Sequence, residues 1–106
     1  MESMFEGCTS LNHIDLTNIE TTNVTTMFNM FSKCQSLNNL DFTFVNTEKV
    51  TNMRNMFYRC KALSNLNLSY FYTQNVTTME SMFSGCNSLI TLDLSSFETP
   101  KLENLP

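Results

Sequence analysis

Residues 25–50 read TTMFNMFSKCQSLNNLDFTFVNTEKV, and the apolar pattern of this stretch occurs four times in the 106-residue chain. Nine positions are apolar in every copy, and each recurs at an interval of 26 residues without a slip. A fixed interval of this length indicates one small structural unit that is copied and stacked. We therefore expect a single domain, 1–106, with copies at about 1–24, 25–50, 51–76 and 77–102 and a remnant at 103–106.

The first half of each copy has the spacing of a helix. Met27, Met30, Phe31 and Cys34 fall at i, i+3, i+4 and i+7, which is one face of an α-helix. Thr25 stands just before this run, where it can cap the first amides. The pattern predicts a helix of about two turns, which is too short to be stable without the rest of the stack.

The second half of each copy alternates like a strand. Leu40 and Phe42 face one side, Asp41 faces the other, and polar residues 46–49 follow as a turn. The predicted fold is therefore an α/β right-handed solenoid of four repeats. The motif L-x-x-L-x-F-x-x-V at residues 37–45 resembles the strand signature of leucine-rich repeats, so the solenoid is expected to be leucine-rich-repeat-like. A short parallel β-sheet forms one face of this predicted fold, and short helices form the other.

A family resemblance adds to this interpretation. The motif L-x-x-L-x-L at residues 89–94, preceded by F-Y-T-Q-N-V-T-T-M-E-S-M-F-S-G-C-N-S at 71–88, resembles the repeat of the BspA-like leucine-rich surface proteins. The resemblance covers the whole chain and departs from the family pattern at Lys33 and Arg59, where Gly is common. It implies an extracellular or cell-surface location and a role in adhesion or in binding proteins. It implies no common catalytic residue.

Composition restricts the possible partners. The formal net charge is −4, which disfavours nucleic acid because phosphates need a basic surface. No apolar run approaches the roughly 20 residues of a membrane span, so we expect no membrane insertion. Three N-x-S/T sequons, at Asn23, Asn67 and Asn75, matter only in a eukaryotic secretory pathway.

The four cysteines are expected to be structural. They lie at Cys8, Cys34, Cys60 and Cys86, on the apolar face of the predicted helices. Local pairs such as C-x-x-C, which metal sites prefer, do not occur. A disulfide between neighbouring copies is the alternative. Packing as small buried thiols is favoured, and neither a metal site nor a cofactor is expected.

Polar residues on the outer face of the predicted strands form one candidate site. Asp15, Asp41 and Asp93 are equivalent residues, and Asn67 takes this place in the third copy. They favour a turn-forming role, with a polar ligand surface or calcium bridging as alternatives. His13 is the only histidine and pairs with no nucleophile in a recognised motif, so we predict that the chain is not an enzyme.

Aromatic residues outside the repeated positions form the second candidate site. Phe44 and Tyr70 are equivalent in adjacent copies and are expected to stack, and Tyr72 and Tyr58 lie near. Clustered exposed aromatics are typical binding anchors, although they also cover core edges. The predicted partner-binding residues are thus His13, Asp15, Asp41, Phe44, Tyr70, Tyr72 and Asp93.

Two functions follow from these candidates. The first is a non-enzymatic module that binds a protein or glycan, or mediates adhesion, through the predicted sheet face. The alternative is a structural element that associates head to tail, or belongs to a longer array, through exposed end residues. These end residues are Met4, Phe5 and Leu11 at one end and Phe97, Leu102 and Leu105 at the other.

Overall fold

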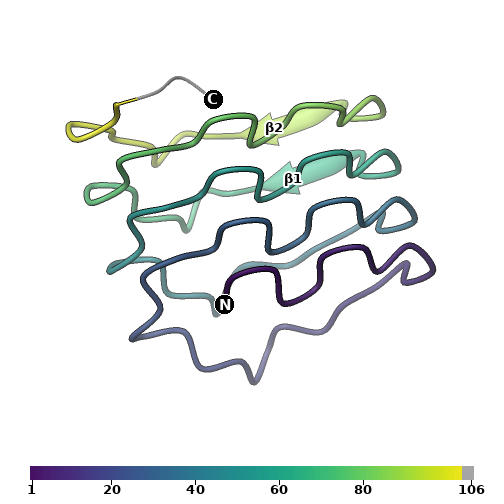
Figure 1. Cartoon of the computed structure of the whole chain (residues 1–106), viewed down its shortest axis with the longest axis horizontal. Helices are drawn as coiled ribbons and strands as arrows, with labels where there is room; N and C mark the ends of the chain where they lie inside the picture. Colours follow the sequence, from purple (N-terminus) through teal and green to yellow (C-terminus); the bar gives the residue numbers. More distant parts are fainter. Residues whose placement is uncertain (104–106) are drawn as a thin grey trace.

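The structure, a computed structural model, describes residues 1–103 as layers of chain stacked on one another (Figure 1). The chain crosses the molecule and returns in each layer, from the purple N-terminal layer to the yellow C-terminal one. The Cα atoms extend over 34 × 29 × 22 Å. Most of the predicted remnant, including the end residue Leu105, lies outside the described residues.

Regular secondary structure is limited to two short strands. β1 (Asn65–Asn67) pairs in parallel with β2 (Thr91–Asp93), with Leu66 opposite Leu92. Isolated parallel bridges join His13 to Asn39, Thr26 to Asn52, and Asn52 to Thr78. The prediction of an α/β solenoid with short helices and a four-stranded sheet is therefore wrong: residues 1–103 contain no helix and one two-stranded sheet.

Left-handed backbone residues explain the missing helices. In the second copy Asn29 has φ 56° and Lys33 has φ 63°, so the right-handed helical conformation is interrupted every four residues. The same two positions have positive φ in the other copies. These residues are Ser3, Gly7, Asn55, Arg59, Ser81 and Gly85. We name the segments that contain them, 1–8, 27–34, 53–60 and 79–86, the turn segments.

The amides of the first three turn segments alternate between two kinds of partner. The amide of Met30 donates to the carbonyl of Met27, three residues back, at 3.1 Å. The next amide, that of Phe31, donates instead to the carbonyl of Met56 in the neighbouring layer, at 2.9 Å. Every second amide therefore joins two layers, which an α-helix cannot do because all of its interior amides bond within the helix.

The threonines expected to cap helices also join layers. The amide and the hydroxyl of Thr51 both donate to the carbonyl of Thr25, at 2.8 and 3.2 Å. Thr77 makes the same two bonds to the carbonyl of Thr51, at 2.8 and 3.1 Å. The hydroxyl of Thr26, one residue later, accepts the amide of Phe28 and closes a local turn.

Side chains that compete for backbone amides account for the short strands. The Asp41 carboxylate accepts the amide of Thr43 at 2.9 Å, and Asn67 accepts the amide of Ser69 at 2.9 Å. An amide bonded to a side chain two residues back is not available to a neighbouring strand. β1 and β2 accordingly end at Asn67 and Asp93.

The core consists of columns, by which we mean equivalent residues from successive copies. Phe5, Phe31, Phe57 and Phe83 form stacked pairs with ring centroids 5.5, 5.7 and 6.0 Å apart. Phe42 meets Phe31 and Phe57 edge-on, at 5.9 and 5.8 Å. Both arrangements are favourable for aromatic rings. Equivalent side chains therefore do lie over one another, as the interval predicts, although the backbone around them is not helical.

The cysteine thiols form a column beside the phenylalanines. Cys60 Sγ donates to the carbonyl of Phe31 at 3.1 Å, and Cys34 Sγ donates to the carbonyl of Phe5 at 3.0 Å. All four cysteines are free, and Cys34 and Cys60 are fully buried. Burial raises the pKa of Cys34 to about 11, because the thiolate would lose its hydration.

Replacing Lys33 by glycine should stabilise the chain. Left-handed backbone costs about 1–2 kcal/mol for a residue with a Cβ, whereas glycine costs about 0.5–1 kcal/mol in extra chain entropy. Urea unfolding should therefore show Lys33→Gly to be about 0.5–1 kcal/mol more stable than the parent chain.

Lys61→Gly is the matched control for this comparison. Lys61 is also exposed, but it is not among the residues with positive φ, so only the entropy cost applies. Equal destabilisation by the two glycine variants would contradict the proposed strain at Lys33.

Candidate binding surface

The predicted aspartates lie on the exposed outer face and shape the backbone. Asp15 accepts the amide and the hydroxyl of Thr17, at 2.9 and 2.8 Å. Asp41 accepts the same two groups of Thr43, at 2.9 and 2.6 Å. These bonds lower the pKa of both carboxyls, because they favour the charged form. The aspartates thus have the turn-forming role that their sequence pattern favours.

Asp93 repeats this arrangement at the end of β2. It accepts the amide of Ser95 at 2.9 Å, and hydrogen bonds from Ser95 lower the pKa of its carboxyl. Asn67 makes the corresponding bond without a charge, so the row of carboxylates is interrupted in the third copy. No group of three His, Cys, Asp or Glu side chains within residues 1–103 is arranged to hold a metal ion.

His13 and the residues that replace it line the outer face beside the aspartates. The His13 backbone forms a bridge with Asn39, and the hydroxyl of Thr91 donates to the side chain of Asn65 at 2.6 Å. An open hollow of about 450 Å³ lies on this face and extends from the second copy to the fourth. Its lining is Asn39, Leu40, Leu94 and the residues of β1 and β2.

The aromatic residues gather at a second hollow. Phe44, Tyr70 and Tyr72 are 65%, 58% and 46% exposed, and they line an open hollow of about 340 Å³. We name this feature the aromatic hollow; the rest of its lining is Thr43, Val45, Asn46, Thr47 and Glu48. Phe44 and Tyr70 do not form a stacked pair among the ring contacts of residues 1–103, contrary to the expectation.

Tyr58, the fourth candidate, lies elsewhere. It belongs to a turn segment and is half-buried, and the guanidinium of Arg59 lies 5.0 Å from its ring centroid. Its ring is therefore covered by the chain itself. The structure thus brings together Phe44, Tyr70 and Tyr72 and separates Tyr58 from them.

A buried threonine holds Tyr72 in place. The hydroxyl of Thr47 accepts the amide of Tyr72 at 2.8 Å and donates to its carbonyl at 2.9 Å. Thr73 makes the same two bonds to Glu98, and the Thr21 hydroxyl accepts the amide of Asn46. The sequence pattern placed Thr47 in a polar turn and did not indicate this role. Its recurrence at an interval of 26 was the available signal.

We name residues 17–23, 43–49, 69–75 and 95–101 the exit loops. Acidic residues are exposed both on the outer face and in these loops. They are Asp15, Asp41 and Asp93 on the outer face and Glu20, Glu48 and Glu98 in the exit loops. Their two lysines, Lys49 and Lys101, donate to Asn23 and Asn75 at 3.0 and 2.9 Å. The other basic residues lie in or just after the turn segments: Lys33, Arg54, Arg59 and Lys61.

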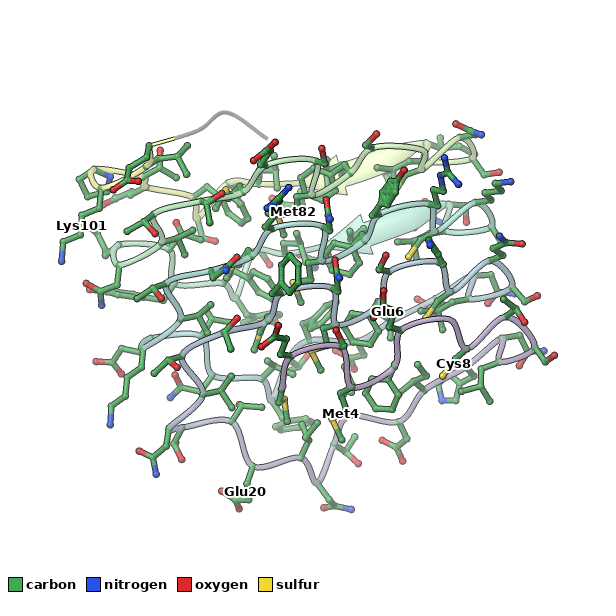
Figure 2. All side chains as sticks on the ribbon, in the orientation of Figure 1. Met4, Glu6, Cys8, Glu20, Met82 and Lys101 are labelled. Carbon is green, nitrogen blue, oxygen red and sulfur yellow. The ribbon has the colours of Figure 1, made fainter. Side chains whose placement is uncertain are left out.

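Within residues 1–103, the first and the last layer each leave one surface that no other layer covers. Met4 and Leu11 are exposed in the first layer, where Figure 2 labels Met4, and Leu94 is exposed in the last. Phe5, Phe97 and Leu102 are only partly buried, as expected for residues of the first and last layers. The described residues contain no helix long and apolar enough to cross a membrane.

A comparison with family models finds a match over the chain. The model described as "Mycoplasma protein of unknown function, DUF285" matches residues 1–65 and 39–106. The two matches overlap and together span the chain. The chain belongs to the DUF285 family. No curated protein and no solved structure matches it. The family description assigns no activity.

Thr47→Val should disturb the aromatic hollow of the DUF285 chain. Valine keeps the shape of threonine but leaves the part-buried amide and carbonyl of Tyr72 without a partner, which costs about 1–3 kcal/mol. We expect that loss in urea unfolding, together with amide chemical-shift changes at Tyr72. Thr22→Val is the control. Thr22 is exposed and follows Thr21, the residue equivalent to Thr47, so its replacement should change neither the stability nor the Tyr72 amide shift. Unchanged stability in Thr47→Val would contradict this role.

Proposed function

We propose that the chain is a non-catalytic binding module that acts at a cell surface and holds a protein or glycan partner in the aromatic hollow. One observation supports this most: three large aromatic side chains are exposed together where the core does not need them. The equivalent residues of Phe44 and Tyr70 in the outer copies are Asn18 and Ser96. Aromatic residues that packing does not require are typical anchors for partners.

The stack provides a rigid support for such a surface. The backbone below the hollow is fixed by Thr47, and the core beside it contains Phe42 and Phe71, with ring centroids 5.1 Å apart. A binding surface on a rigid support loses little entropy when a partner binds. The resemblance to surface proteins supports the proposed location.

The chain's own copies suggest variants that test the proposal without unfolding the protein. Phe44→Asn, Tyr70→Ser and Tyr72→Asn introduce the residues found at the equivalent Asn18, Ser96 and Asn46. The parent chain should retain ligands from a glycan array and from a displayed random peptide library. The triple variant should lose at least about 90% of that signal, because its anchors are gone.

Ile90→Asn is the matched control for the triple variant. Ile90 is the most exposed large apolar residue among residues 1–103 and lies outside the aromatic hollow. Asn occupies the equivalent positions 12 and 38. This control should keep every ligand of the parent chain. Retention of the same ligands by the triple variant, or the absence of any ligand for the parent chain, would refute the proposed function.

Head-to-tail association is the second candidate, and the backbone of the last layer favours it. The amides of Phe57 and Arg59 donate to Met82 and Ser84 in the next layer. The equivalent amides of Phe83 and Gly85 have no acceptor within residues 1–103. A second copy placed with its first layer against these donors would provide carbonyl acceptors.

Light scattering over a concentration series tests this second candidate. A stacking chain should increase in mass with concentration, and Leu11→Glu should reduce the effect because it places a charge in the contact. Leu94→Glu at the opposite surface should do the same. A constant monomer mass up to millimolar concentration would rule the association out.

A further inference from the structure

The exposed rings of the aromatic hollow lack the cations that cover two half-buried rings elsewhere in this chain. Arg54 lies 6.0 Å from the ring centroid of Phe28, and Arg59 lies 5.0 Å from that of Tyr58. These distances are within the range of cation–π attraction. Among residues 1–103, no cation and no stacked ring lies over Phe44, Tyr70 or Tyr72.

Charge around the hollow favours a cationic group. Glu48 lines the hollow, and its backbone amide bonds to Asn46, which also lines it. The nearest lysine along the chain, Lys49, is bonded to Asn23. A lining that combines open aromatic rings with an acidic residue complements a positive charge and does not complement an anion.

The arrangement of the rings favours a flat cation. Phe44 and Tyr70 come from adjacent layers, and layers joined by backbone hydrogen bonds lie about 5 Å apart. A guanidinium is planar, stacks on aromatic faces and is more weakly hydrated than an ammonium. It can therefore contact a ring with its face while its edge donates to a carboxylate.

We propose that the aromatic hollow binds the arginine side chain of an extended peptide segment, with the guanidinium over the aromatic rings and bonded to Glu48. This inference rests on the proposed binding function and specifies its ligand as a basic peptide rather than a glycan. The acidic residues of the exit loops would attract further basic residues of the same segment.

A pair of matched peptides tests the proposal on the full chain. The first probe is the capped peptide acetyl-Gly-Arg-Gly-Arg-Gly-amide, and the second replaces both arginines by citrulline, which has the same shape without charge. Titrations are followed by calorimetry and by amide chemical shifts. The arginine peptide should bind with shifts at residues 43–48 and 70–72, and the citrulline peptide should bind at least about tenfold more weakly.

Variants separate the ring contribution from the charge contribution. Tyr70→Leu keeps an apolar side chain but removes the ring, and should weaken the arginine peptide by about five- to tenfold. Glu48→Gln should weaken it by a similar factor and reduce its dependence on salt. Ile90→Asn should leave binding unchanged, and unchanged thermal unfolding of each variant shows that the fold is retained.

The outcomes distinguish this inference from the proposed function. The arginine site is overturned if the two peptides bind equally. It is also overturned if the arginine peptide binds both single variants, Tyr70→Leu and Glu48→Gln, as tightly as the parent chain. If a neutral oligosaccharide such as chitotetraose produces the shifts at residues 43–48 and 70–72 while the arginine peptide does not, the binding module stands and the arginine site is overturned. The arginine site is supported if the citrulline peptide loses binding to the parent chain while the arginine peptide keeps it, and if both variants bind the arginine peptide more weakly.

Discussion

Backbone hydrogen bonds between layers are the interaction on which the rest of the structure depends. In the first three turn segments every second amide donates to a carbonyl in the next layer, as that of Met27 does to Asn52 and that of Phe31 does to Met56. These bonds align each copy with the next, so the phenylalanine rings stack and the thiols reach carbonyls across the layer boundary. The exposed aromatic residues are held by the same alignment, because Thr47 bonds to Tyr72 from one layer to the next.

The sequence predicted which residues are buried but not the backbone that buries them. Met27, Met30, Phe31 and Cys34 are all buried, as the helical spacing requires. A run of tight turns with left-handed residues at Asn29 and Lys33 buries the same positions, and periodicity does not distinguish the two structures. Glycine indicates a left-handed residue at only two of the eight positions, Gly7 and Gly85, since the other six carry Ser, Asn, Lys or Arg.

The candidate surface was predictable in part. The exposed Phe44, Tyr70 and Tyr72 differ from the residues at the equivalent positions of other copies, and this difference is visible in the sequence alone. Their shared hollow, the separation of Tyr58 and the role of Thr47 depend on how loops of adjacent layers meet, which the spacing of residues does not specify. The observed sheet is smaller than the predicted sheet of four strands, because Asp side chains bond to amides that a sheet would use.

The constant offset between bonded residues also limits how the chain can change in length. Thr51 bonds to Thr25 and Thr77 bonds to Thr51, so removing one complete unit gives each remaining layer an equivalent neighbour. Deleting a single residue instead displaces every later donor from its acceptor and turns inward side chains outward. Genes for such chains are therefore expected to gain and lose whole units by recombination, while small insertions survive only at the outermost loops.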